Sequence, residues 1–236
     1  MKSFLLASLL IGMALAQTAL ADGLIYALPA DGAQARYDMQ ITIVGQDVKI
    51  GGSVTVSSVG QVTVDNEKCR WIEIKMITKA DDQEQIGLSK VLIPEKHLGK
   101  DKSPGSNMIR AWIKEGDMAP MEVKDFSDPT TLALAAFLTG PGQNAATLDA
   151  LEVENAKLGK LSCPGVTGQH DINGPNGLTI GIQAENRLHE KAPFGLVSAD
   201  WKFDLKANGQ VAASGSFKLT LTDISTTALS ELPDRN

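Results

Sequence analysis

The chain contains few of the side chains on which most enzymes depend. Only three histidines occur in its 236 residues, and Phe, Trp and Tyr together make up 5%. His97, His170 and His189 each lie beside charged or turn residues, which is typical of solvated histidines. The sequence has no G-x-S-x-G, S-x-x-K or H-E-x-x-H motif to place a nucleophile or a metal. We therefore expect a protein that is not an enzyme, with no catalytic residues, no metal and no cofactor; a hydrolase is the remote alternative.

Positive charge is also scarce. The chain has 22 Lys and Arg against 28 Asp and Glu, a net charge of −6. Removal of an N-terminal segment that includes Lys2 would leave 21 − 28 = −7. Phosphate backbones are bound largely by Lys and Arg, so we expect no nucleic acid among the partners. No long run of basic residues favours an anionic membrane surface either.

Two cysteines are the fewest that can form a disulfide, and here they are Cys69 and Cys163. In an oxidising compartment two cysteines most simply pair, and a loop of about 95 residues would be worth roughly 4 to 5 kcal/mol on the chain-entropy model. The alternative is two buried free thiols. Neither residue has a second Cys or a His at ligand spacing, which argues against zinc.

The long apolar run that marks a membrane-targeted chain occurs at the N-terminus. Lys2 is followed by "FLLASLLIGMALA" and then by "TALA", which ends at Ala21 with small residues where a signal peptidase cleaves. This pattern predicts a signal peptide over residues 1–21 and a single β-rich domain over 22–236, exported to the periplasm or the cell exterior. The run is short for a bilayer span, so we expect no transmembrane anchor. Asp22 stands where a lipid-anchored protein needs Cys, so we expect no lipid anchor either.

Strict alternation of apolar and polar residues dominates the rest of the chain. In "RYDMQITIV", residues 36–44, Tyr37 and Met39 face one way and Asp38 the other, the period of a strand with one wet side. Similar patterns predict further strands at 48–56, 70–78, 86–93, 108–114, 177–185, 199–207 and 211–223. The "GQD" at 45–47 and "ANGQ" at 207–210 predict hairpin turns.

Two segments depart from this alternation. "SDPTTLALAAFLTG", residues 127–140, has a capping Ser or Asp, a Pro in the first turn and a closing Gly, which predict a buried helix. The second segment, residues 144–158, is ambiguous: "NAATLDALEVENAKL" suits a helix, whereas "LEVENAKLGKLSC", residues 151–163, suits a pair of strands.

A sheet of many strands with one apolar face must bury that face, and the apolar helix expected in mid-chain suggests that the sheet curls around a helix. We expect a mainly β protein, a single curved antiparallel sheet (a half-barrel or open barrel) packed on one or two helices. The order of signal peptide, opening hairpin "YDMQITIVGQDVKIGGSVTV", meander, helix and closing hairpin "SADWKFDLKANGQVAASGSFKLTLTDI" resembles periplasmic lipoprotein-carrier-like proteins. It is also similar to uncharacterised secreted bacterial proteins. The first resemblance implies a space between sheet and helix that holds acyl chains.

The stretch "HEKAPFGLVSADWKF", residues 189–203, predicts a corner that leads into a strand, because Pro193 fixes one backbone angle and Gly195 permits a bend. If the sheet encloses a cavity, the expected lining residues are Trp71, Trp112, Phe194, Trp201 and Phe203. The favoured function is non-enzymatic binding of a lipid-like or other hydrophobic small molecule in the concave face. The alternative is a structural or protein-interaction module of the cell envelope with a self-filled core; the oligomeric state is left open.

Overall fold

A computed structural model describes residues 24–45, 49–80, 83–100, 102, 104–124, 126, 138, 143–173 and 177–232. The expected signal peptide, residues 1–21, lies outside the described residues. So does the expected helix at 127–140, apart from Leu138, which is fully buried. No helix in the described part of the chain is long and apolar enough to cross a membrane.

Eleven strands within these ranges form one sheet. They are β1 (Gln34–Ile43), β2 (Lys49–Val64), β3 (Glu67–Ala80), β4 (Gln83–Pro94), β5 (Arg110–Glu115), β6 (Met121–Val123), β7 (Gln143–Asn155), β8 (Gly159–Asn173), β9 (Leu178–Leu188), β10 (Leu196–Ala207) and β11 (Gln210–Ser225). Two short 3-10 helices, η1 (Glu95–His97) and η2 (Gly105–Asn107), lie between β4 and β5.

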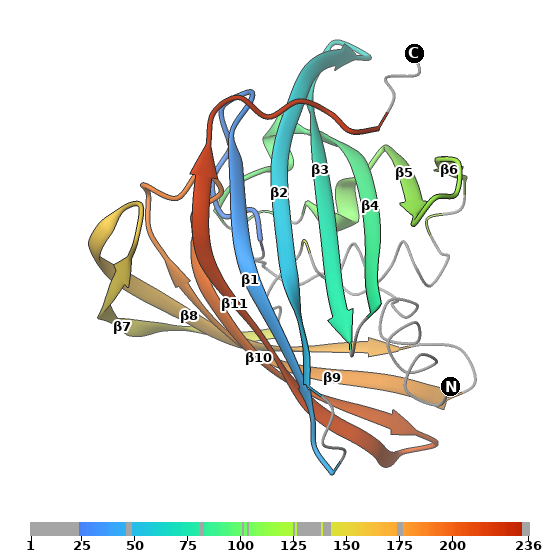
Figure 1. Cartoon of the computed structure of the whole chain (residues 1–236), viewed down its shortest axis with the longest axis vertical. Helices are drawn as coiled ribbons and strands as arrows, with labels where there is room; N and C mark the ends of the chain where they lie inside the picture. The colour runs from blue at the N-terminus through green and yellow to red at the C-terminus, as the bar shows by residue number, and fades with distance from the viewer. Residues whose placement is uncertain are drawn as a thin grey trace.

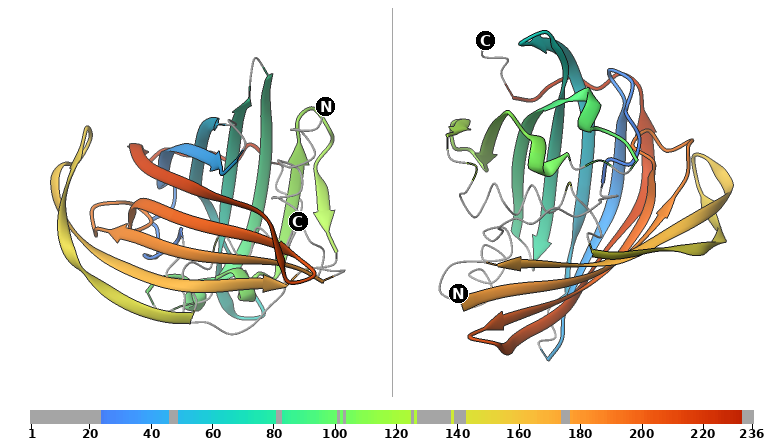
Figure 2. Two further views of the ribbon diagram at one scale, coloured as in Figure 1. Left: turned by 90° about the horizontal axis from the view of Figure 1, so that it is seen from below. Right: turned by 180° about the vertical axis from the view of Figure 1, so that it is seen from behind.

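The strand order is β6-β5-β4-β3-β2-β1-β11-β10-β9-β8-β7, and every neighbouring pair is antiparallel. Two meanders are therefore joined through the pairing of the first strand with the last. The sheet is open and strongly curved: β1 to β4 run steeply in Figure 1, whereas β8 to β10 sweep across below them. The two further views in Figure 2 show the same curl from below and from behind. The prediction of a curved, mainly antiparallel sheet is confirmed.

Local patterns explain most of these strands. Tyr37 and Met39 are buried and Asp38 is exposed, as the alternation predicts. The predicted turn between β10 and β11 contains Asn208 and Gly209, both with positive φ (52° and 79°), as a two-residue hairpin requires. Strand β2 runs to Val64 rather than ending near residue 56, because pairing with β3 continues past a register shift.

The helical alternative for residues 144–158 is wrong, and the strand-pair alternative is confirmed. β7 and β8 form an antiparallel hairpin whose turn contains the Asn155 side chain, which accepts hydrogen bonds from the backbone N–H groups of Lys157 and Leu158. The Asn155 amide also donates to the carbonyl of Leu221 on β11 at 2.7 Å. Tertiary pairing and this buried anchor override the helix propensity of the Ala and Leu residues.

The sheet separates two apolar clusters. On β3, Ile72 belongs to the larger cluster and its neighbour Trp71 to the smaller one. Since successive side chains of a strand point to opposite faces, the clusters lie on opposite sides of the sheet. The larger cluster fills the concave face, which is the far side in Figure 1 and also carries η1 and η2. The smaller one lies on the outer face beneath the C-terminal segment.

The predicted disulfide is wrong in this structure: Cys69 and Cys163 are both free and buried. Cys69 lies on β3 in the outer cluster, whereas Cys163 lies on β8 in the larger cluster. Strands β2, β1, β11, β10 and β9 stand between them in the sheet. Burial raises the pKa of both thiols, which keeps them in the unreactive protonated form.

Candidate functional site: the concave face of the sheet

One end of the concave face is closed by loops, and we call it the loop end. Leu24, Ile25 and Phe194 are exposed by 1% or less there. The backbone N–H groups of Tyr26 and Ala27 both donate to the carbonyl of Phe194, at 2.7 and 3.1 Å. The corner at residues 189–195 therefore covers one end of the core, and the Phe194 side chain is buried in that core.

Gly195 allows this corner to pack closely against the N-terminal loop. Its φ is +84°, and a Cβ there would lie 2.8 Å from the Cβ of Tyr26. Both the backbone conformation and the close approach of the N-terminal loop exclude an ordinary side chain. The prediction of a bend at this glycine is confirmed, and the reason for it is a contact with a segment about 170 residues earlier in the chain.

Trp201 lies further along the concave face, on β10. Its indole Nε1 donates to Oδ1 of Asn186 on β9 at 2.9 Å, and Asn186 is fully buried. Its ring lies against that of Phe217, with 5.4 Å between centroids. Trp201 is thus oriented by a polar anchor on one neighbouring strand and an aromatic contact on the other.

Phe203 follows two residues later, on the same face of β10. It is half-buried, and its cross-strand partner on β11 is Gly215. A Cβ at Gly215 would lie 2.8 Å from Cε1 of Phe203 and closer still to Cζ of Phe203 and the carbonyl oxygen of Thr42. The absence of a side chain at Gly215 therefore leaves room for the Phe203 ring against the β11 backbone.

Toward the other end, where β1 ends and β11 begins, some apolar side chains of this face are only partly buried, although Ile43, Ile50 and Leu205 beside them are exposed by 8% or less. We call the partly buried residues the apolar band; they are Ile41, Met76, Ile182, Phe203 and Phe217. They come from β1, β3, β9, β10 and β11, so strands distant in sequence contribute to one surface. Cross-strand pairing places Phe203 opposite Ile182, and Phe217 opposite both Ile41 and Trp201.

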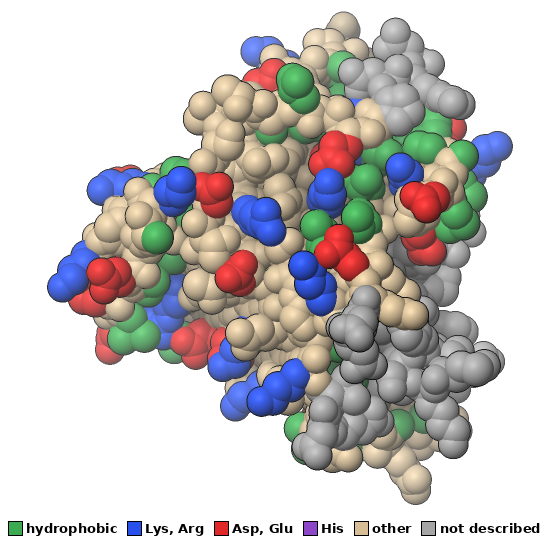
Figure 3. Space-filling view, viewed as in Figure 1, with side chains coloured by type: hydrophobic (Ala, Val, Ile, Leu, Met, Phe, Trp, Pro, Cys, Tyr) green, Lys and Arg blue, Asp and Glu red, His purple; other side chains and the backbone are tan. Residues whose placement is uncertain are grey.

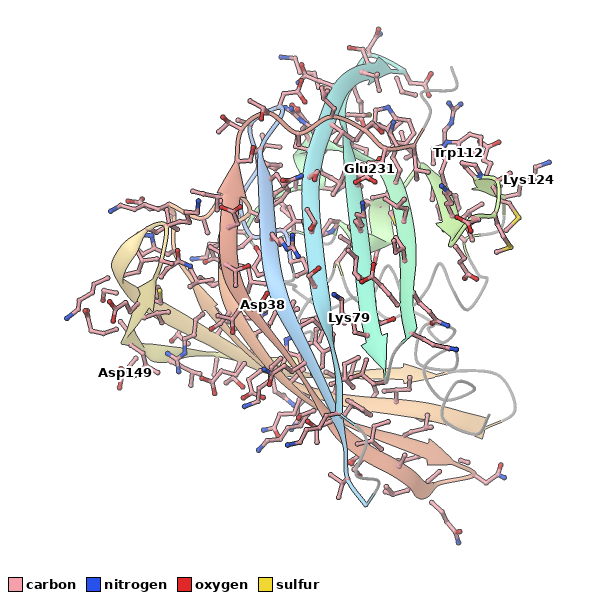
Figure 4. All side chains as sticks on the ribbon, in the orientation of Figure 1. Asp38, Lys79, Trp112, Lys124, Asp149 and Glu231 are labelled. Carbon is pink, nitrogen blue, oxygen red and sulfur yellow. The ribbon has the colours of Figure 1, made fainter. Side chains whose placement is uncertain are left out.

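Trp71 and Trp112, two of the five residues expected to line a cavity, do not lie on the concave face. Both belong to the outer cluster, on β3 and β5, together with Leu88 and Leu92 of β4. Figure 4 labels Trp112 on the right-hand side of the sheet, beside Glu231 of the C-terminal segment. Their place in the sequence pattern was that of buried strand residues, and only the direction of curvature assigns them to the outside.

A polar cluster borders the loop end. Arg70 donates to Oε1 of Glu95 through Nε (3.0 Å) and Nη2 (2.6 Å), and Gln61 donates to the same oxygen at 2.7 Å. Burial by itself would raise the pKa of Glu95, but these hydrogen bonds outweigh it and hold the pKa below its ordinary value. Asp31 lies 3.6 Å from Nη1 of Arg70. This cluster stabilises an ion pair at the edge of the core.

In the ranges given above, no three His, Cys, Asp or Glu residues gather as a metal site requires. His189, one of the candidate bases, accepts a hydrogen bond at Nδ1 from the backbone N–H of Lys191 and so belongs to the turn. What the concave face presents is mainly apolar surface, with buried polar groups at Tyr37, Asn155 and Asn186 that each make a hydrogen bond.

Sequence reasoning did not assign Asn186, Gly215 or most of the apolar band to a site. The alternation places Ile41, Met76 and Phe217 on the apolar face of their strands, but it does not show which level of that face stays incompletely buried. Asn186 interrupts the apolar pattern of "IQAENRL", residues 182–188, and such a polar residue at an inward position is the signal that could have marked it.

Comparison with known proteins finds no matching family model and no matching curated protein. Two solved structures resemble the chain in fold. The first is a putative exported protein with a YmcC-like fold from Bacteroides fragilis NCTC 9343 (8% identity, TM-score 0.37, covering 85% of this chain and 99% of that one). The second is a beta-barrel-like protein of a domain of unknown function, DUF1849, from Brucella abortus (8% identity, TM-score 0.26, covering 85% and 98%). Neither description names an activity.

Proposed function

We propose that this chain is an exported, non-enzymatic protein that binds a lipid-like hydrophobic ligand on the concave face of its sheet. The observation that carries the proposal is the apolar band. At the loop end the core is filled by its own side chains, whereas Ile41, Phe203 and Phe217 are only partly buried among buried neighbours such as Ile43, Ile50 and Leu205. Concave apolar surface with few polar groups is the usual form of a small-molecule site.

The apolar band is suited to an acyl chain because its members are large, are contributed by paired strands and, apart from Met76, lie in neighbouring cross-strand positions. Each methylene group removed from water contributes about 0.8 kcal/mol, so ten of them would contribute about 8 kcal/mol before the cost of immobilising the ligand. The buried amide of Asn186 beside Trp201 fixes the indole, which gives one wall of the surface a defined orientation. A long single chain therefore fits this chemistry better than a compact polar molecule.

The three tryptophans allow a direct test, because two are on the outer face and one is on the concave face. Brominated stearic acid quenches a tryptophan that it contacts. We expect quenching in the double variant Trp71→Phe, Trp112→Phe, in which Trp201 is the fluorophore. We expect none in Trp201→Phe. The melting temperature of each variant reports whether its fold is retained.

A matched pair of substitutions on β11 measures the affinity. Phe217→Ala should weaken binding about tenfold, corresponding to roughly 1.4 kcal/mol, because it removes a ring from the apolar band. Val211→Ala lies on the same strand, where the side chain is 57% exposed, and should leave affinity unchanged. Absence of quenching in both tryptophan variants would refute the proposal and favour the alternative, an envelope structural or interaction module with a self-filled core.

Export is the second part of the proposal and has its own support in the apolar segment after Lys2. Expression with the native N-terminus followed by N-terminal sequencing of the purified protein should give Asp22 as the first residue. A product that begins at Met1 would contradict export by this route without bearing on the ligand.

A further inference from the structure

The outer face of the sheet carries the chain's own C-terminal segment, and we call the outer-face residues that contact this segment the groove. We call residues Thr226–Leu232 the strap. It leaves β11 at Ser225 and crosses the near side of the sheet in Figure 1 toward β4. Cross-strand pairing aligns the residues beneath it in one row: Ser225, Gln34, Ser57, Glu73, Lys90 and Trp112.

The strap crosses this row without regular secondary structure, with bends at Thr226, Glu231 and Leu232. From β11 to β3 there are three interstrand spacings, about 14 Å. The six residues from Ser225 to Glu231 can span at most about 21 Å. A segment without regular secondary structure leaves its backbone N–H and C=O groups available to the residues beneath it, as bound peptides do.

Glu73 is the residue that binds this backbone. It is 4% exposed, and its carboxylate accepts hydrogen bonds from Oγ of Ser230 at 2.8 Å and from the backbone N–H groups of Glu231 and Leu232 at 3.0 and 3.2 Å. A buried carboxylate is costly unless such donors are present. Most of the hydrogen bonds that Glu73 accepts from these residues come from backbone N–H groups, so the contact recognises the backbone of the segment.

Two further contacts give the groove its side-chain preference. Leu232 is 2% exposed and packs in the outer cluster with Trp71 and Trp112, and its carbonyl accepts a hydrogen bond from Nζ of Lys90 at 3.3 Å. Lys90 is itself 1% exposed and lies 5.1 Å from the centroid of the Trp71 ring.

On the solvent side, Lys75 pairs with Glu231 of the strap at 2.7 Å. In Figure 4, Glu231 lies over β3. Figure 3 shows acidic and basic side chains interspersed on this face. The strap residues that contact the groove are thus a hydroxyl residue, an acidic residue and a leucine in succession.

The connection between β11 and these anchors has exposed side chains, although its backbone packs against Gly32, where a Cβ would lie 2.6 Å from the carbonyl oxygen of Thr226. Thr226 and Thr227 are exposed, and Leu229 is 86% exposed. Ala228 donates one backbone hydrogen bond to the carbonyl of Gly32 at 2.9 Å. A segment anchored at one end through an exposed short connection can be exchanged between copies, because the same contacts are then re-formed between two molecules.

We propose that the outer-face groove is a peptide-binding site, occupied in cis by the strap, and that it accepts the strap of a second copy of this chain by exchange. The occupant is specified by the contacts of Glu73, Lys90 and Trp71 with Ser230, Glu231 and Leu232. The proposal is independent of the concave-face ligand, since it uses the opposite side of the sheet.

The test uses two full-length variants that complement each other. Ser230→Ala, Leu232→Ala weakens the strap and leaves the groove intact, whereas Glu73→Gln weakens the groove and leaves the strap intact. Each alone should stay monomeric by native mass spectrometry, and a mixture with one variant labelled with ¹⁵N should give a heterodimer. In parallel, a fluorescent peptide of residues 226–236 should bind the strap-weakened variant at least tenfold more tightly than the wild type, while a peptide with both alanines should not bind.

Three results would overturn the proposal. The mixture could contain monomers alone although both variants retain the wild-type circular dichroism spectrum. The peptide could bind without any heterodimer forming, which would exclude a second copy as the occupant. The strap-weakened variant could lose its native spectrum, which would show that the strap is an inseparable part of the fold rather than a removable ligand.

Discussion

Adjacent glycines on β2, Gly51 and Gly52, have opposite surroundings and should respond oppositely to the same substitution. A Cβ on Gly52 would clash with the carbonyl oxygen of Ile77 on β3 and would lie 3.0 Å from Cε of Met39. A Cβ on Gly51 would meet nothing within 4 Å. The obstruction at Gly52 is backbone of the neighbouring strand, so it can be relieved only by moving the β2–β3 ladder.

Gly52→Ala should therefore lower the free energy of unfolding by about 2 kcal/mol, within the usual range for overpacking. For a domain of this size that corresponds to a decrease in melting temperature of roughly 4 to 8 °C. Gly51→Ala should be neutral or raise stability by up to about 1 kcal/mol, because alanine reduces the entropy of the unfolded chain. Neither residue has a positive φ, so backbone conformation does not separate them.

Urea unfolding monitored by circular dichroism gives both values, with equal slopes as the sign that the unfolded states are comparable. Equal stability of the two variants would refute the assignment of the clash. A Gly51→Ala variant that is the less stable of the two would refute the registration of β2 against β3.

The two thiols, the Glu95 carboxylate and the Asn155 amide each support a separate measurement. Cys69 and Cys163 should both react with a thiol reagent after denaturation without reductant and be protected in the native protein; fewer than two thiols would contradict the structure. Hydrogen bonds lower the pKa of Glu95, so its contribution to stability is present above the unfolded value, about 4.3, and is lost as the pH falls through the folded value. In Glu95→Gln the urea midpoint should decrease less as the pH falls. A pH dependence equal to that of the wild type would argue against the ion pair. Asn155→Ala should lower the free energy of unfolding by about 1 to 3 kcal/mol and speed amide hydrogen exchange in the β7–β8 hairpin. Unchanged exchange in this hairpin would show that the hydrogen bond to Leu221 does not anchor it.

Much of the fold could be predicted from the sequence because alternation is a local property. Eight strand segments and the positive-φ turn at Asn208 and Gly209 follow from residues close together in the chain. The β7–β8 hairpin was ambiguous, since its Ala and Leu residues suit a helix and its anchor on β11 is distant in sequence. The disulfide prediction failed because cysteine spacing carries no information about which face of a sheet each cysteine occupies.

The candidate site was predicted less completely than the fold. Phe194, Trp201 and Phe203 do lie on the concave side, whereas Trp71 and Trp112 lie on the outer face. A period of two separates the faces of a strand, but it does not state which face the sheet curves toward. On β3 both faces are buried in part, because the strap covers the outer one.

The sequence by itself determined that this chain is a β protein with an apolar N-terminal segment, an acidic balance and strands whose faces differ, since each of these is a property of composition or of neighbouring residues. Only the tertiary structure decided that β1 pairs with β11, that the sheet curves away from Trp71 and Trp112, and that Glu73, expected to face water, is buried under the C-terminal strap. The physical reason is that these outcomes depend on contacts between segments far apart in the chain, whose free energy is set by the whole sheet.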